Sequence, residues 1–211
     1  PYSDGGLVII YAFKNDTWEP TQIIDHDSVS YFGLNVFFDS TVPDIVVVTG
    51  HLDDDTNAVV VYELDEYSQF AIKGEILSGD MSFGQSVIIY NTTCVGISTS
   101  NYDKGQSGQY GKISIYIYYS GIWRDIWTKE GDDVCSLLGF KIQNYKNIVA
   151  TIDVNNALYI SIFDTQTFEQ VHFQYLYLNG TITNFIFRST SILIVVKDKG
   201  QFNLFTFCQN T

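Results

Sequence analysis

Short runs of β-branched and aromatic residues recur along the whole chain, separated by Gly, Asn, Asp and Ser. Several runs alternate between apolar and polar positions. In the stretch 112–118, Ile113, Ile115 and Ile117 occupy every second position, which gives a β-strand one uniformly apolar face. No stretch keeps a helical period over three turns. The pattern therefore predicts an all-β protein.

One strand type, rich in Val, Ile and Tyr, marks an internal repeat. Its copies are Leu7–Phe13, Val59–Leu64, Ile113–Tyr119, Leu158–Phe163 and Phe202–Phe207. Their first residues are 52, 54, 45 and 44 positions apart, and each interval holds about four strand signals. This spacing is typical of a β-propeller with four-stranded blades. We predict four units, at residues 5–57, 58–110, 111–156 and 157–200, and a final strand in 201–211.

A Phe-Gly pair provides a second marker of the same repeat. Phe32-Gly33 recurs as Phe83-Gly84, changes to Leu138-Gly139 in the third unit and is lost at Thr183-Asn184 in the fourth. A β-sandwich also places turns every 8–12 residues, but it gives no reason for this recurrence. We therefore favour a propeller. The four units form either a segment of a larger propeller or a small closed one, in which residues 202–207 complete the sheet begun by residues 7–13.

Residues 31–36 and 82–87 resemble the propeller repeat of integrin alpha subunits, called the FG-GAP repeat. The apolar strand and turn at 45–50 and the strands at 59–62 and 111–116 also fit that repeat. The resemblance covers residues 5–119. It implies one single domain or segment of a seven-bladed propeller, exported through the secretory pathway to the cell surface or beyond. It further implies a non-catalytic module for adhesion, with no cofactor.

That family often binds calcium in the loop that follows its Phe-Gly strand. The loop at 39–44 and its counterparts at 91–93, 144–147 and 189–191 supply too few carboxylates for the six to eight oxygen ligands of calcium. Two other acidic groups stand out. Asp25 and Asp27 have alternating spacing and form a weak candidate metal site, whereas the run 53–55 with Asn57 is typical of a solvated hairpin tip.

Composition limits the partners. The 211 residues carry a formal net charge of −13, which repels phosphate backbones, so a nucleic-acid partner is not expected. No apolar run approaches the ~20 residues that span a bilayer, so this segment is not expected to insert into a membrane. The chain opens inside a repeat, without an initiator Met or a signal peptide. We therefore expect a processed or excised piece of something longer.

Cysteines and sequons bear on the compartment. Cys94 and Cys135 lie in adjacent units and could form a disulfide, which would leave Cys208 unpaired or joined to a missing segment; buried free thiols are an equal alternative. Sequons for N-linked glycosylation begin at Asn15, Asn91 and Asn179, all in predicted loops between strands. If the protein is secreted, we expect at least one of them to carry a glycan.

No enzymatic motif is present in the sequence. His26, His51 and His172 stand at no recognised spacing from a Cys or an acid, and residues 105–108 lack the spacing of a nucleophile elbow. The leading hypothesis is an extracellular propeller that binds a protein partner through its loops, with Trp18, Trp123 and Tyr102 as candidate anchors or core residues. The alternatives are a self-associating filament subunit, and a propeller enzyme that acts on glycans with catalytic groups converging at its central channel.

Overall fold

Seventeen antiparallel strands and no helix make up the described part of the chain. The computed structural model describes residues 5–52, 56–80, 82–103, 108–131, 138–139, 141–145, 148–153, 157–164, 169–188, 191–199 and 201–208. None of these residues forms a helix able to cross a membrane. The strands are grouped into five sheets, and in each sheet consecutive strands pair in chain order.

Three of the five sheets have four strands, and the two sheets at the ends of the chain have fewer. The first sheet holds β1 (Val8–Lys14) and β2 (Thr17–Ile24). The complete sheets hold β3 (Ser30–Phe38), β4 (Ile45–His51), β5 (Asn57–Leu64) and β6 (Phe70–Ser78); then β7 (Phe83–Asn91), β8 (Cys94–Thr99), β9 (Lys112–Tyr119) and β10 (Ile122–Glu130); then β11 (Lys141–Tyr145), β12 (Ile148–Ile152), β13 (Ala157–Phe163) and β14 (Gln170–Tyr177). The last sheet holds β15 (Thr181–Arg188), β16 (Ser191–Asp198) and β17 (Gln201–Cys208).

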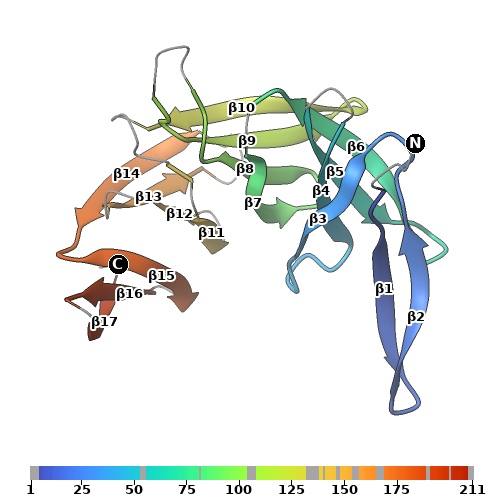
Figure 1. Cartoon of the computed structure of the whole chain (residues 1–211), viewed down its shortest axis with the longest axis horizontal. Helices are drawn as coiled ribbons and strands as arrows, with labels where there is room; N and C mark the ends of the chain where they lie inside the picture. The colour runs from blue at the N-terminus through green and yellow to red at the C-terminus, as the bar shows by residue number, and fades with distance from the viewer. Residues whose placement is uncertain are drawn as a thin grey trace.

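The sheets follow one another around an arc, with β1–β2 at one end and β15–β17 at the other (Figure 1). This confirms the predicted all-β propeller of four-stranded blades. Within the described residues, β1 pairs only with β2 and β17 only with β16. The alternative in which residues 202–207 complete the sheet begun by residues 7–13 is therefore wrong. Each sheet after the first starts at the strand of the Phe-Gly marker or its counterpart. A unit counted from the Val/Ile/Tyr strand therefore takes two strands from each of two successive sheets.

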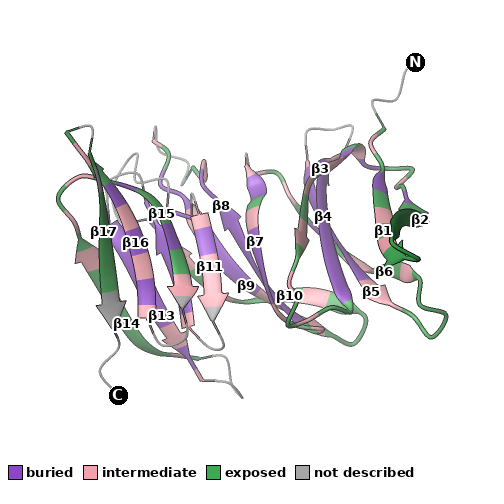
Figure 2. Ribbon diagram, turned by 90° about the horizontal axis from the view of Figure 1, so that it is seen from below, coloured by how far each residue is buried: buried purple, intermediate pink, exposed green. Residues whose placement is uncertain are grey.

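The core consists of four apolar clusters, each between two consecutive sheets. In β4, Val46 and Val48 pack toward β1–β2, whereas Ile45 and Val47 pack toward β7 and β8. A strand that is buried on both faces needs no polar positions, which explains the uninterrupted apolar run at residues 45–48 of β4. In Figure 2 the buried positions lie on the middle strands of the sheets, and exposed positions gather on β2, β14 and β17.

The glycine of the Phe-Gly marker has a packing role. Gly33, Gly84 and Gly139 all have positive φ, at 86°, 78° and 88°, a conformation that strains residues with a Cβ atom. Each also lies against the start of the third strand of the preceding sheet; a Cβ on Gly84 would come within 2.7 Å of Val59 Cγ2. The marker therefore identifies the point where one sheet closes onto the next.

Cys94 is a free thiol, completely buried in β8. Cys135, the other member of the predicted disulfide, lies outside the described residues, and Cys208 lies in β17. Burial raises the pKa of the Cys94 thiol from 9.0 to about 12, because the thiolate would lose its hydration.

Two consequences of the raised pKa of Cys94 can be measured. The folded state favours the neutral thiol of Cys94. The contribution of this thiol to the free energy of unfolding is therefore complete below pH 9 and is lost as the pH rises from 9 through 12.

At pH 8 we also expect iodoacetamide to modify Cys94 only after unfolding, as followed by peptide mass spectrometry with and without denaturant. Rapid modification of Cys94 in the native protein would contradict the burial.

Candidate functional site

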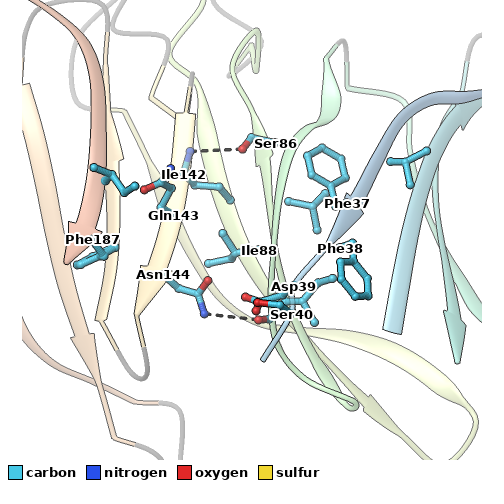
Figure 3. Close-up of a pocket in the computed structure, with 14 residues that line it drawn as sticks. Phe37, Phe38, Asp39, Ser40, Ser86, Ile88, Ile142, Gln143, Asn144 and Phe187 are labelled. Carbon is cyan, nitrogen blue, oxygen red and sulfur yellow. Dashed lines mark hydrogen bonds between the residues drawn. The ribbon is translucent and has the colours of Figure 1, made fainter. Parts of the chain in front are cut away.

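A hollow of about 670 Å³ lies along the inner strands, on the axis of the arc. We call it the axial hollow. It is lined by consecutive residues of β3 and its following loop, β7, β11 and β15: Val36–Ser40, Ser86–Ile89, Ile142–Asn144, Ile186 and Phe187. Figure 3 shows side chains of these four segments around the same space. The site is therefore built by the first strand of each of four successive sheets, far apart in the sequence.

The lining combines aromatic rings with polar groups. Phe37, Phe38 and Phe187 provide flat apolar surface, and the polar groups are the Asp39 carboxylate, the amides of Gln143 and Asn144 and the hydroxyls of Ser40 and Ser86. This mixture fits a ligand with an apolar face and a rim of hydrogen-bonding groups.

Asp39 is held in place by its own loop. Its Oδ1 accepts hydrogen bonds from the backbone N–H of Thr41 and from Thr41 Oγ1, both at 2.7 Å. These bonds fix the side chain and leave Oδ2 able to accept a hydrogen bond or a proton from a ligand. Among the described lining residues, Asp39 is the only one with an ionisable side chain.

Side chains also tie the inner strands together across the sheets. The backbone N–H of Ile142 donates to Ser86 Oγ at 3.4 Å, and Asn144 Nδ2 donates to the backbone oxygen of Ile89 at 3.5 Å (Figure 3). Both bonds connect β11 to β7. Lys141, the residue before this stretch, donates from Nζ to Asn184 Oδ1 on β15, and burial lowers its pKa. These contacts set the relative positions of the strands that line the axial hollow.

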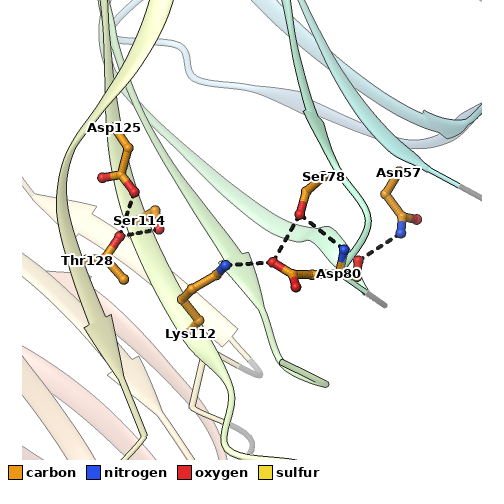
Figure 4. A network of polar contacts seen from close by, with 7 residues as sticks. All are labelled: Asn57, Ser78, Asp80, Lys112, Ser114, Asp125 and Thr128. Carbon is orange, nitrogen blue, oxygen red and sulfur yellow. Dashed lines mark hydrogen bonds and ion pairs between the residues drawn. The ribbon is translucent and has the colours of Figure 1, made fainter. Parts of the chain in front are cut away.

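A second polar group joins the loop after β6 to the start of β9 (Figure 4). Asp80 Oδ2 accepts hydrogen bonds from Lys112 Nζ at 2.6 Å and from Ser78 Oγ at 3.0 Å, and the Asp80 backbone oxygen accepts one from Asn57 Nδ2 at 2.8 Å. Lys112 Nζ also lies 4.1 Å from the centre of the Tyr102 ring. None of these residues lines the axial hollow, so the group holds two sheets together rather than facing a ligand there.

We expect Asp80→Ala to lower the free energy of unfolding by about 2 kcal/mol, because it removes the charged acceptor of Ser78 and of the largely buried Lys112. Chemical denaturation with urea measures this loss. Asp27→Ala removes the same charge from an exposed loop position and should change stability by less than about 0.5 kcal/mol. Equal effects of the two variants would show that the loss comes from net charge rather than from the contacts.

A third polar group fastens the two-stranded first sheet to its neighbour. His26 Nε2 lies 2.9 Å from Glu75 Oε1, and Ser28 Oγ lies 3.4 Å from His26 Nδ1. The side chain of Gln22 bonds to both the backbone N–H and the backbone oxygen of Phe70. His26 is therefore placed by tertiary contacts that its sequence spacing did not reveal.

The residues singled out in the sequence do not converge. Asp25 and Asp27 are exposed in the loop after β2, and in the described part of the chain no three His, Cys, Asp or Glu side chains gather as metal ligands. Residues 53–55 and 104–107 lie outside the described residues. Asp39 belongs to the loop at 39–44, which is too poor in carboxylates for calcium. Its position directly after a Phe-Gly strand is the sequence signal that could have placed it in the axial hollow.

The three sequon asparagines, Asn15, Asn91 and Asn179, are all exposed. Their glycosylation stays a prediction, as do the extracellular location and the protein partner. Of the three candidate anchors, Trp18 is exposed in β2, Tyr102 is half-buried against Lys112, and Trp123 packs against the cluster between the first two complete sheets.

No protein-family model and no curated protein matches the chain. Among solved structures, it is similar to a protein of Bacteroides uniformis named "putative 6-phosphogluconolactonase", with 8% sequence identity and a TM-score of 0.61. That match covers 99% of this chain and 62% of the other, so this chain spans about three fifths of that protein's length. A protein of the same name from Bacteroides fragilis gives 10% identity and a TM-score of 0.42, over 96% of this chain and 77% of that one.

These comparisons correct several predictions. The resemblance to the integrin alpha-subunit repeat is wrong, because no family model supports it and the structures that share the fold carry another name. The non-catalytic adhesion module and the absence of enzymatic activity are wrong together with that resemblance, and the similar structure carries the name of an enzyme. The glycoprotein class has no support from the comparisons. At 8% identity the likeness establishes the architecture, a β-propeller of four-stranded blades.

Proposed function

We propose that the chain is part of a propeller enzyme that acts on a carbohydrate, and that a sugar lactone without a phosphate group binds in the axial hollow. The observation that carries the proposal is the combination of one fixed carboxylate, two amides and three aromatic rings around a space of about 670 Å³ on the propeller axis. The name of the similar Bacteroides uniformis protein supports a sugar lactone as the substrate, but it specifies a phosphorylated one.

The chemistry of a sugar lactone matches this lining. Its ring carbons present an apolar face that can lie against Phe37 or Phe187, and its hydroxyls can bond to the amides of Gln143 and Asn144. The described lining contains no Lys or Arg, and the chain carries a net charge of −13. A phosphorylated sugar would meet repulsion here, so a neutral substrate is favoured.

Hydrolysis of a lactone needs a base for the attacking water. In the proposed reaction, Asp39 Oδ2 accepts a proton from water as the water oxygen bonds to the carbonyl carbon. The ring C–O bond then breaks, and the released alkoxide takes the proton back as it becomes a hydroxyl. The products are the open-chain acid and no other group, so no co-reactant is required.

The proposal is tested with glucono-δ-lactone and its 6-phosphate. Hydrolysis is followed in a pH-stat at pH 6.5, and the backbone amides of β3, β7 and β11 are followed by NMR during titration with glucose, a neutral sugar that cannot be hydrolysed. We expect hydrolysis above the spontaneous rate, preference for the neutral lactone and amide shifts confined to the axial hollow. Spontaneous-rate hydrolysis together with unshifted amides would overturn the proposal, and preference for the phosphate would overturn its substrate class.

A further inference from the structure

Two equivalent positions of the repeat differ sharply in exposure. Val36 is the fourth residue after Phe32, as Val87 is the fourth after Phe83; Phe38 and Ile89 are likewise the sixth. Val87 and Ile89 are 7% and 3% exposed, whereas Val36 and Phe38 are 48% and 59% exposed. The same part of the repeat is therefore core in one sheet and surface in the other.

The cause lies in the preceding sheet. Val87 and Ile89 pack against a cluster that includes Ile45 and Val47 of β4 and, at its edge, Phe37 of β3, which are the first two strands of the sheet before them. Val36 and Phe38 pair across the sheet with Val48 and Val46, whose side chains face β1–β2. Within the described residues, the first sheet holds only β1 and β2. These two strands correspond to the third and fourth strands of the complete sheets.

One edge of β1 also has no partner strand within the described residues. Its counterparts β5, β9 and β13 each pair with a strand on both sides. Within the described residues, β1 pairs only with β2, and Figure 1 shows its other edge open toward the inside of the arc. An unpaired edge beside an exposed apolar face is a template for strand addition.

We propose that a two-stranded antiparallel β-hairpin, with the sequence pattern of β3–β4, docks at this place. Its second strand adds to the open edge of β1, and its first strand covers Val36 and Phe38. The strand next to β1 is apolar on both faces, because β4, β8 and β12 at the same position have almost every residue buried. The occupant is thus defined by the chain's own repeat.

The hairpin would also complete the axial hollow. Val36 and Phe38 belong to its lining, so the first strand of the hairpin supplies a further wall beside β3. The proposal does not depend on the reaction proposed above, because it rests on exposure and strand pairing alone.

The test supplies the proposed hairpin covalently. A copy of residues 30–56 is placed ahead of Leu7 in place of residues 1–6, so that the copied second strand precedes β1 as β4 precedes β5. We expect the backbone amides of β1 to exchange with solvent at least tenfold more slowly, and the melting temperature to rise by about 3–8 °C. The control carries Ser at the two positions of the copy that correspond to Val46 and Val48, and it should show neither effect.

A second pair of variants tests the face itself. Val36→Ser with Phe38→Ser should hardly alter the melting temperature of the 211-residue chain but should abolish the gain from the added hairpin, whereas Val87→Ser should lower the melting temperature of both forms. Unchanged exchange of β1 amides in the extended chain would overturn the proposal. So would a dimer of the 211-residue chain, seen by analytical ultracentrifugation and lost in the double variant, because a second copy would then be the occupant.

Discussion

Asp39→Asn is expected to lower kcat/KM for a neutral sugar lactone by about 10²- to 10⁴-fold, the usual contribution of a positioned general base. The amide cannot accept the proton of the attacking water, but its oxygen can still accept the hydrogen bonds from Thr41, so the loop should keep its conformation. Initial rates in the pH-stat measure the loss, and KM should change much less than kcat.

Asp44→Asn is the matched control for this variant. Asp44 is exposed in the same loop and does not line the axial hollow, so the same change of charge should leave the rate within about twofold. If both variants hydrolyse the lactone like the parent, Asp39 is not the base. If both lose activity equally, the effect comes from the charge of the loop rather than from the position of one carboxylate.

Gly84→Ala is expected to destabilise the fold by about 2–5 kcal/mol. A residue with a Cβ at φ 78° costs about 1–2 kcal/mol in backbone strain, and overpacking a close contact adds about 1–3 kcal/mol. The new methyl would lie 2.7 Å from Val59 Cγ2 and 3.0 Å from Thr49 Cγ2, at the contact between two sheets. Urea denaturation gives the difference in the free energy of unfolding.

Gly121→Ala separates the effect of backbone strain from the effect of overpacking. Gly121 has a similar φ of 84°, but a Cβ there would meet nothing within 4 Å. This variant should therefore lose only the strain of about 1–2 kcal/mol. A Gly84→Ala loss no larger than that of Gly121→Ala would mean that the sheets can move apart to admit the methyl, and that the Phe-Gly marker reflects backbone conformation alone.

The architecture could be predicted from the sequence because its determinants are local and repeated. The glycine at 33, 84 and 139 marks the approach of one sheet to the next. The Val/Ile/Tyr strand is the third strand of every sheet except the first, which it opens as β1. The fourth unit has lost the glycine, at Thr183-Asn184, and so carries the weakest sequence signal of the repeat.

The same determinants explain why the integrin resemblance was misleading. A Phe-Gly pair answers a packing requirement: Phe32 and Phe83 are buried, and the following glycine fits a narrow gap. Any propeller that stacks its sheets this closely meets that requirement, whatever its family. The pair therefore carries information about architecture and none about adhesion.

The axial hollow could not be predicted from spacing. Asp39, Ser86 and Asn144 are more than forty residues apart in succession, and only the order of the sheets brings them together. Their roles also depend on side-chain direction. The side chain of Ile142 packs against the sheet of β7 and that of Asn144 bonds to β7, whereas the side chain of Lys141 bonds to β15. Residue spacing within one sequence gives no signal for such convergence.

The four apolar clusters of the core stand in series, each shared by two neighbouring sheets. No side chain of the first cluster takes part in the last, so stability is close to a sum of nearest-neighbour terms, as in repeat proteins. Denaturation should then proceed through partly folded forms that lose a terminal sheet first, and limited proteolysis should yield nested fragments that retain the three complete sheets, β3–β14. The thermal transition should be broad, because the terminal sheets contribute to its early part and the complete sheets to its late part.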